Sequence, residues 1–140
     1  MILFCDTSAL VKLYVDEPGS GAVAAEAASA EAIAVSRIAW VEAMAAFARR
    51  VREHPADADA IEQARDALRA QWSDFLVVEC DQAVVERAGD HAEAFALRAY
   101  DAVQLATLDE LHRSLPGEVR FACADRRLLG AARVLGIETA

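Results

Sequence analysis

Four acidic residues of this sequence occupy positions where a carboxylate suggests a chemical role. Asp6 directly follows the apolar run at residues 2–5, and Asp125 follows another apolar run after a single alanine. Glu42 and Asp101 each have apolar residues on both sides. A charged side chain in such surroundings is unusual unless it faces a functional site. These four carboxylates are therefore the candidate reactive groups of the chain.

Carboxylates that converge without a cation repel one another, raise one another's pKa values and destabilise the fold. A hard divalent cation resolves this conflict. Mg²⁺ prefers oxygen ligands and commonly combines one or two carboxylates with waters and a substrate phosphate, and Mn²⁺ can substitute for it. Such a site activates water for attack on a phosphodiester and stabilises the leaving oxygen. The acids together therefore predict a metal-dependent hydrolytic site.

Each acid taken singly also has an ordinary structural interpretation. Asp6 and Asp125 follow predicted strands, where a turn residue or a helix cap is common. Glu42 and Asp101 could lie at the exposed edge of a helix or pair with a nearby arginine, such as Arg37 or Arg98. The set of four is more specific than any one member.

The elements that must position these acids alternate between strand and helix. Apolar runs predict buried strands, with a last edge strand at the C-terminus, at residues 2–5, 33–35, 75–78, 119–123 and 137–139. Helical spacing and breaker residues predict helices at residues 9–15, 21–30, 37–53, 57–72, 82–95, 101–112 and 126–135. Candidate N-cap residues are Thr7 or Ser8, Ser36 and Asp81. This order predicts an α/β fold, an open three-layer sandwich with a short, mostly parallel central sheet and helices on both faces.

In an open parallel sheet, ligands gather beyond the carboxyl ends of the strands, where the strand order reverses. Asp6 and Asp125 each follow a predicted strand, so we expect both on that edge of the sheet. Glu42 and Asp101 then belong to helices that would have to reach the same edge.

Length and composition are typical of a single folded domain spanning residues 1–140. The chain is 56% hydrophobic and 26% charged, which excludes wholesale disorder. A net charge of −9 argues against coating nucleic acid by bulk electrostatics, although a local basic patch remains compatible with it. No stretch approaches the roughly 18 apolar residues of a membrane span, and no signal peptide is recognised. The three cysteines form no CxxC pair, which favours buried reduced thiols in a cytosolic protein.

The segments around the acids resemble the four acidic motifs of PIN-domain proteins, in the same order and at suitable intervals. The small size and the form of the motifs resemble VapC-type toxins of bacterial toxin–antitoxin pairs, and the resemblance covers nearly the whole chain. The matching segments are Phe4-Cys5-Asp6-Thr7-Ser8-Ala9-Leu10-Val11-Lys12, Ser36-Arg37-Ile38-Ala39-Trp40-Val41-Glu42, Leu97-Arg98-Ala99-Tyr100-Asp101-Ala102-Val103-Gln104-Leu105-Ala106 and Phe121-Ala122-Cys123-Ala124-Asp125-Arg126-Arg127-Leu128.

The resemblance implies a magnesium-dependent endoribonuclease, with Mn²⁺ as a possible substitute. It makes Asp6, Glu42, Asp101 and Asp125 the metal-binding and catalytic acids. It further implies a structured tRNA or rRNA substrate, a cognate antitoxin, a homodimer and a cytoplasmic location.

Residues next to two of these acids could supply polar contacts to the site. By the same resemblance, Thr7 or Ser8 would orient Asp6 or a metal-bound water. Cys123-Ala124 departs from the pattern, because a threonine or serine is more usual before the fourth acid. This departure leaves the predicted metal site intact, but it removes the hydroxyl group that would make a contact before the fourth acid.

An acidic nuclease needs basic groups for its substrate, and the sequence does not rank them. The available phosphate contacts are Lys12, Arg49, Arg50, Arg52, Arg98, Arg126 and Arg127. Trp40, Trp72, Tyr100 and Phe47 could stack on bases, but helical spacing favours packing for Trp40 and Phe47.

Other functions fit the sequence less well. A haloacid-dehalogenase phosphatase needs a second aspartate two residues after the first, where Ser8 stands. A response-regulator receiver needs an early acidic pair, and residues 1–15 contain only Asp6. The sequence lacks the Gly-x-Ser-x-Gly elbow of a nucleophilic hydrolase, and its histidines are expected at surface or capping positions. The alternative that remains is a catalytically silent PIN-like module that binds a regulatory partner.

Overall fold

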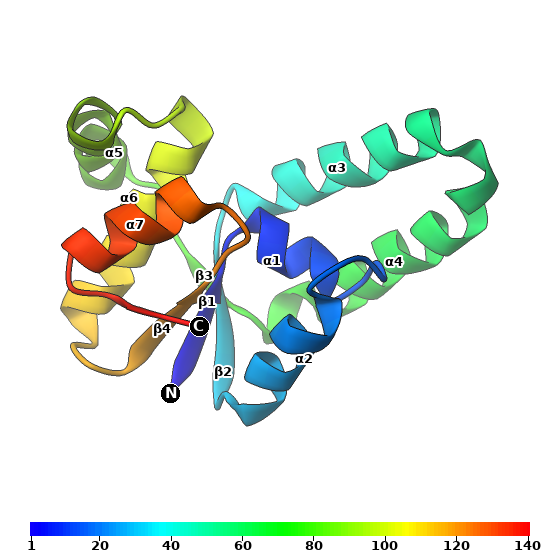
Figure 1. The fold of residues 1–140 in the computed structure, drawn as a ribbon, viewed down its shortest axis with the longest axis horizontal. Coiled ribbons are helices and arrows are strands. Elements are labelled where there is room, and N and C mark those ends of the chain that lie inside the picture. The colour runs from blue at the N-terminus through cyan, green and yellow to red at the C-terminus, as the bar shows by residue number, and fades with distance from the viewer.

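The computed structural model describes all 140 residues as a five-stranded parallel sheet with helices on both faces (Figure 1). The strands are β1 (Ile2–Cys5), β2 (Ala32–Ser36), β3 (Leu76–Val78), β4 (Val119–Ala122) and β5 (Glu138–Thr139). Their order is β3-β2-β1-β4-β5, and every neighbouring pair is parallel. The chain therefore builds outward from β1 in one direction, then crosses to its other side. The predicted fold class is confirmed.

The helices divide between the two faces of the sheet. They are α1 (Thr7–Lys12), α2 (Ser20–Ser29), α3 (Ala39–Glu53), α4 (Ala58–Gln71), α5 (Gln82–Phe95), α6 (Ala99–Ser114) and α7 (Arg126–Val134). Two short 3₁₀ turns flank α4, at Pro55–Asp57 and Trp72–Asp74. In Figure 1 the helices α1 to α4 lie on one side of the sheet, and α5 to α7 lie on the other. The α3–α4 hairpin projects away from the sheet.

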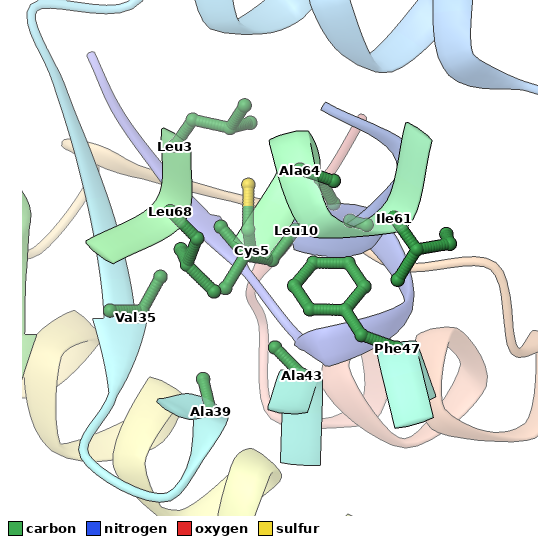
Figure 2. Close-up of a cluster of buried hydrophobic side chains, with 12 residues drawn as sticks. Leu3, Cys5, Leu10, Val35, Ala39, Ala43, Phe47, Ile61, Ala64 and Leu68 are labelled. Carbon is green, nitrogen blue, oxygen red and sulfur yellow. The ribbon is translucent and has the colours of Figure 1, made fainter. Parts of the chain in front are cut away.

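Alternating residues of the central strand supply a separate core to each face. Leu3 and Cys5 of β1 pack with Leu10, Phe47 and Ile61 from the helices of the first face (Figure 2). Phe4, between them in sequence, points to the opposite face and packs with residues of α6, α7 and β4, including Leu105, Leu108, Phe121 and Leu128. Burial on both faces explains why β1 is a continuous apolar run rather than an alternating one.

The predicted elements agree with the structure to within a few residues, with informative exceptions. Residues 75–78 were expected as a buried strand, but β3 lies at the edge of the sheet and Leu76 is 41% exposed. Asp6, rather than Thr7 or Ser8, caps α1. Ser36 ends β2 and does not cap α3, whose N-cap residue Ile38 makes no side-chain cap bond.

Cysteine and histidine positions also refine the expectations. All three cysteines are free thiols, but only Cys5 is buried, whereas Cys80 and Cys123 are half-buried. His91, expected at a surface or capping position, is buried on α5. Its Nε2 lies 3.6 Å from a carboxylate oxygen of Asp109. No helix is both long and apolar enough to span a membrane.

Candidate active site

Two of the four predicted acids lie at the carboxyl edge of the sheet, where the strand order reverses. Asp6 follows β1 and Asp125 follows β4, and these two strands are neighbours on either side of the reversal. Each aspartate also caps the helix after its strand. Asp6 Oδ1 accepts from Ala9 N at 3.0 Å, and Asp125 Oδ1 accepts from Arg127 N at 2.8 Å. The capping interpretation and the functional one are therefore compatible, because the cap bond engages only one of the two oxygens of each carboxylate.

The other two acids reach the same place from helices on opposite faces. On α3, Ala39, Ala43 and Phe47 are buried in the core at helical spacing, which leaves Glu42 half-buried beside that stripe. On α6, Asp101 and Gln104 are three residues apart and so lie on one face of the helix.

All four acids line one cavity of about 580 Å³. Its lining is Asp6, Thr7, Ser8, Val11, Glu17, Glu42, Ala45, Ala46, Tyr100, Asp101, Gln104 and Asp125. The cavity joins segments from the two ends and the middle of the chain. The structure thus brings the predicted acids and both predicted hydroxyl residues together.

Asp6 is the most buried acid of the cavity, with 6% of its surface exposed. Its carboxylate accepts hydrogen bonds from Ser8 Oγ at 2.6 Å and from Cys123 Sγ at 2.9 Å, in addition to the backbone bond. Of the two predicted hydroxyl residues, Ser8 is therefore the one that contacts Asp6. The Cys123 thiol supplies the side-chain donor that the departure from the family pattern had called into question.

Glu42 is held by a separate pair of donors. Thr7 Oγ1 donates to Glu42 Oε1 at 3.0 Å, and Gln104 Nε2 donates to the same oxygen at 2.7 Å. Gln104 Nε2 also lies 3.2 Å from Thr7 Oγ1, so the three side chains link α1, α3 and α6. Thr7 thus contacts Glu42 and not Asp6, and the second carboxylate oxygen of Glu42 accepts no hydrogen bond from the chain.

The electrostatics of the cavity disfavour the charged carboxylates. Burial raises the pKa of Asp6 above its usual range, and the hydrogen bonds from Cys123 and Ser8 only oppose this. Burial likewise raises the pKa of Glu42, against the bonds from Gln104 and Thr7. The pKa of Asp101 is raised by burial and by the charge of Asp125, whereas Arg98 lowers it.

None of the four acids forms an ion pair with a basic side chain, and every salt bridge of the structure involves another acid. Arg37, considered above as a partner for Glu42, pairs with Glu79 instead. Among the acids that line the cavity, only Glu17 pairs with a basic side chain, and its Oε1 lies 2.8 Å from Lys12 Nζ. The cavity therefore contains an excess of negative charge that the chain does not neutralise.

This donor set fits a hard divalent cation, because it consists of carboxylate oxygens from separate elements with no basic partner. As the side chains lie, no three acidic, histidine or cysteine groups are arranged to ligate one ion. Three of the acids, Asp6, Glu42 and Asp125, already accept hydrogen bonds from the chain itself. The chemistry of the lining, and not a preformed ligand cage, is therefore the argument for a metal.

Two residues of the site had not been assigned from the sequence. Gln104 lies in a helix among apolar residues, and it is almost fully buried at 2% exposure. A buried amide in an apolar helix face is the signal that marks it. Cys123 was considered only as a buried thiol and as a departure from a pattern. The sequence signal that could have identified Cys123 is its position directly after β4, where the strand order reverses.

Comparisons with known proteins bear on the family and the fold. The model of the PIN domain family matches residues 3–115. The chain is similar to Ribonuclease VapC45 of Mycobacterium tuberculosis (strain CDC 1551 / Oshkosh), at 36% identity over 99% of this chain and 94% of the relative.

Two solved structures resemble the fold. The crystal structure of M. tuberculosis VapC20, described as a sarcin-ricin loop cleaving toxin, aligns with a TM-score of 0.66 and 18% identity, over 92% of this chain and 94% of that one. A toxin–antitoxin complex from Klebsiella pneumoniae aligns with a TM-score of 0.60 and 23% identity, over 89% and 87%. At these identities the structural likeness concerns the fold alone.

Proposed function

Because the chain belongs to the PIN-domain family, among relatives of the VapC type, we propose that it is a metal-dependent endoribonuclease and the toxin of a toxin–antitoxin pair. The observation that carries this proposal is the cavity lined by Asp6, Glu42, Asp101 and Asp125, none of which is paired with a basic side chain. The curated relatives are named ribonucleases, which supports RNA as the substrate. In this proposal, residues 1–140 form one nuclease domain.

The proposed metal site consists of Asp6, Glu42, Asp101 and Asp125, with Mg²⁺ as the ion and Mn²⁺ as a substitute. A divalent ion held there supplies the Lewis-acid chemistry needed for hydrolysis of a phosphodiester. Ser8 and Cys123 fix the carboxylate of Asp6, and Thr7 and Gln104 fix that of Glu42. These donors hold two acids in place before substrate arrives, which lowers the cost of assembling the site.

The substrate and partners follow from the same proposal. We propose a structured tRNA or rRNA loop as the RNA target, in the cytoplasm where these RNAs are found. A cognate antitoxin is supported by the fold likeness to a toxin–antitoxin complex. A homodimer is also part of the proposal. Tyr100 lines the cavity and is 64% exposed, so it can stack on a base, whereas Phe47 is buried in the core.

The test is cleavage of total cellular RNA by purified protein freed of antitoxin, with Mg²⁺, with Mn²⁺ and with EDTA. Asp6→Asn serves as the control, because asparagine can keep the cap bond to Ala9 N while removing the charge. We expect metal-dependent cutting at a few sites that is lost in EDTA and in the variant.

Equal cutting by Asp6→Asn would contradict the proposed site. Absence of cutting by a folded protein with either metal, across total RNA, would favour the alternative of a silent module that binds a regulatory partner. In that case, capture of a partner without RNA cleavage would be the defining activity.

A further inference from the structure

The structure separates basic side chains that the fold already uses from those it leaves free. Lys12 and Arg50 have carboxylate partners, at 2.8 Å from Glu17 and 3.0 Å from Asp57. Arg49 pairs in the same way one helical turn along α3. Among the candidate phosphate contacts, those without a carboxylate partner are Arg52, Arg98, Arg126 and Arg127.

Two of these free arginines line a second cavity that adjoins the acidic one. This cavity has a volume of about 290 Å³ and is lined by Leu97, Arg98, Asp101, Asp125 and Arg127. It shares Asp101 and Asp125 with the acidic cavity. These two aspartates therefore have the other acids on one side and two guanidinium groups on the other, yet neither aspartate forms an ion pair with them.

The backbone fixes where these arginines stand. Arg98 is the N-cap residue of α6, and its side chain makes no hydrogen bond within the chain and no cap bond. Arg127 lies in the first turn of α7, where its Nη1 donates to the carbonyl oxygen of Ala96 at 3.3 Å. Ala96 ends α5 with a left-handed φ of 52°, so this contact ties α7 to the α5–α6 turn. Arg127 uses one of its guanidinium donors in this way and keeps the others free.

We propose, on the basis of the ribonuclease function above, that Arg98 and Arg127 form a phosphate-binding subsite for the RNA backbone next to the acidic cavity. A polyanion approaching a protein of net charge −9 meets repulsion, most of all at four unpaired carboxylates. Guanidinium groups bind phosphate oxygens through paired N–H donors, which fixes the position of the phosphate as well as attracting it.

This subsite therefore holds one phosphate of the strand while a neighbouring phosphodiester lies over the acids. RNA is preferred here over a protein ligand because the free guanidinium groups adjoin the proposed hydrolytic centre itself. The two arginines act on substrate position, and cleavage chemistry remains with the acids.

The experiment measures binding of a fluorescent, mixed-sequence single-stranded RNA and of bulk tRNA in Mg²⁺, in the Asp6→Asn background. Arg98→Gln, Arg127→Gln and the double variant are compared with Arg52→Gln and Arg126→Gln. Each of the four single substitutions removes one exposed arginine that has no carboxylate partner. Arg52 and Arg126, however, line neither cavity. Loss of long-range attraction is therefore the same in the controls.

We expect Kd to rise about tenfold for each cavity arginine and to change less than about twofold in the controls. The slope of log Kd against log salt should fall by about 0.7 for each lost phosphate contact. In the cleaving protein, the same two changes should raise KM and leave kcat nearly unchanged. Melting curves establish that each variant is folded.

Equal affinity and equal salt slope for the double variant and the controls would overturn the subsite. So would a loss of kcat with unchanged KM and Kd, because the arginines would then act only on Asp101 and Asp125. Failure of the proposed function is seen separately, as cleavage that persists in Asp6→Asn. Absence of RNA binding by the protein would overturn the subsite as well.

Discussion

Helix α6 carries two aspartates, Asp101 and Asp109, whose surroundings are opposite. Asp109, only 3% exposed, has Oδ2 at 3.1 Å from Arg113 Nε, 3.6 Å from His91 Nε2 and 3.7 Å from Arg87 Nε. Asp101, two turns earlier, has no basic partner within ion-pairing distance although Arg98 is close enough to lower its pKa.

Burial alone therefore does not distinguish a structural acid from a functional one. Asp6 is nearly as buried as Asp109, at 6% exposure, but its partners are a hydroxyl, a thiol and a backbone N–H. The charge of Asp109 is balanced by the chain and stabilises the packing of α5 on α6. No basic side chain of the protein balances the charge of the cavity acids, which is why we propose the metal site there.

The largest expected effect is on cleavage by Asp101→Asn compared with Asp109→Asn. Asp101→Asn should lower the cleavage rate by about 10²- to 10⁴-fold while the protein stays folded, because it removes a charge that no side chain of the fold pairs with. Asp109→Asn should leave cleavage within about twofold but lower the free energy of unfolding by about 1–3 kcal/mol. Steady-state cleavage and urea unfolding measure the two effects, and a reversal of the pattern would contradict the assignment.

Metal binding should sharpen the same contrast. At 100 times its Kd, Mg²⁺ or Mn²⁺ should stabilise the folded protein by about 2.7 kcal/mol and raise Tm by several degrees. The shift should vanish in Asp101→Asn and persist in Asp109→Asn. Thermal melting across a metal titration tests this, and an equal shift in both variants would place the metal elsewhere.

The sequence predicted the parts of the site that depend on local order. Asp6 and Asp125 could be placed because each follows a strand, and parallel strands end at one edge. The prediction that β3 is buried was wrong, because an apolar run does not indicate where its strand lies in the sheet. β3 is an edge strand with a neighbour on one side only.

Contacts between distant elements were the part that the sequence could not give. The roles of Gln104 and Thr7 depend on α1, α3 and α6 meeting at Glu42, which no local pattern encodes. The same holds for the arginines, because their pairing partners are fixed by packing. Arg98 and Arg127 became distinguishable from Arg50 only once the ion pairs were known.

A smaller effect on cleavage is expected from substitution of Cys123, whose thiol contacts Asp6. Cys123→Ala removes the thiol donor 2.9 Å from Asp6 Oδ2 and should lower cleavage about tenfold, with a higher metal concentration for half-maximal activity. Cys123→Ser keeps a donor and should retain most of the activity. Cys80→Ala is the matched control, because Cys80 is a half-buried thiol that contacts Ser36 instead. If serine and alanine gave the same loss, Cys123 would not act through its hydrogen bond.

The smallest expected effect is the pH dependence of stability without metal. Burial and the charge of Asp125 raise the pKa of Asp101 from its ordinary value of 3.8, so the folded protein binds this proton more tightly than the unfolded chain does. The resulting stability is fully present below pH 3.8 and is lost as pH rises through the raised pKa of the folded state. In EDTA, Asp101→Asn should therefore melt about one or two degrees above the unsubstituted protein near neutral pH, and this gain should shrink on acidification. Saturating Mg²⁺ should reverse the order, because it favours the charged carboxylate. A gain in EDTA that grows as pH falls would show that Asp101 is stabilised in its charged form by the chain, as Asp109 is.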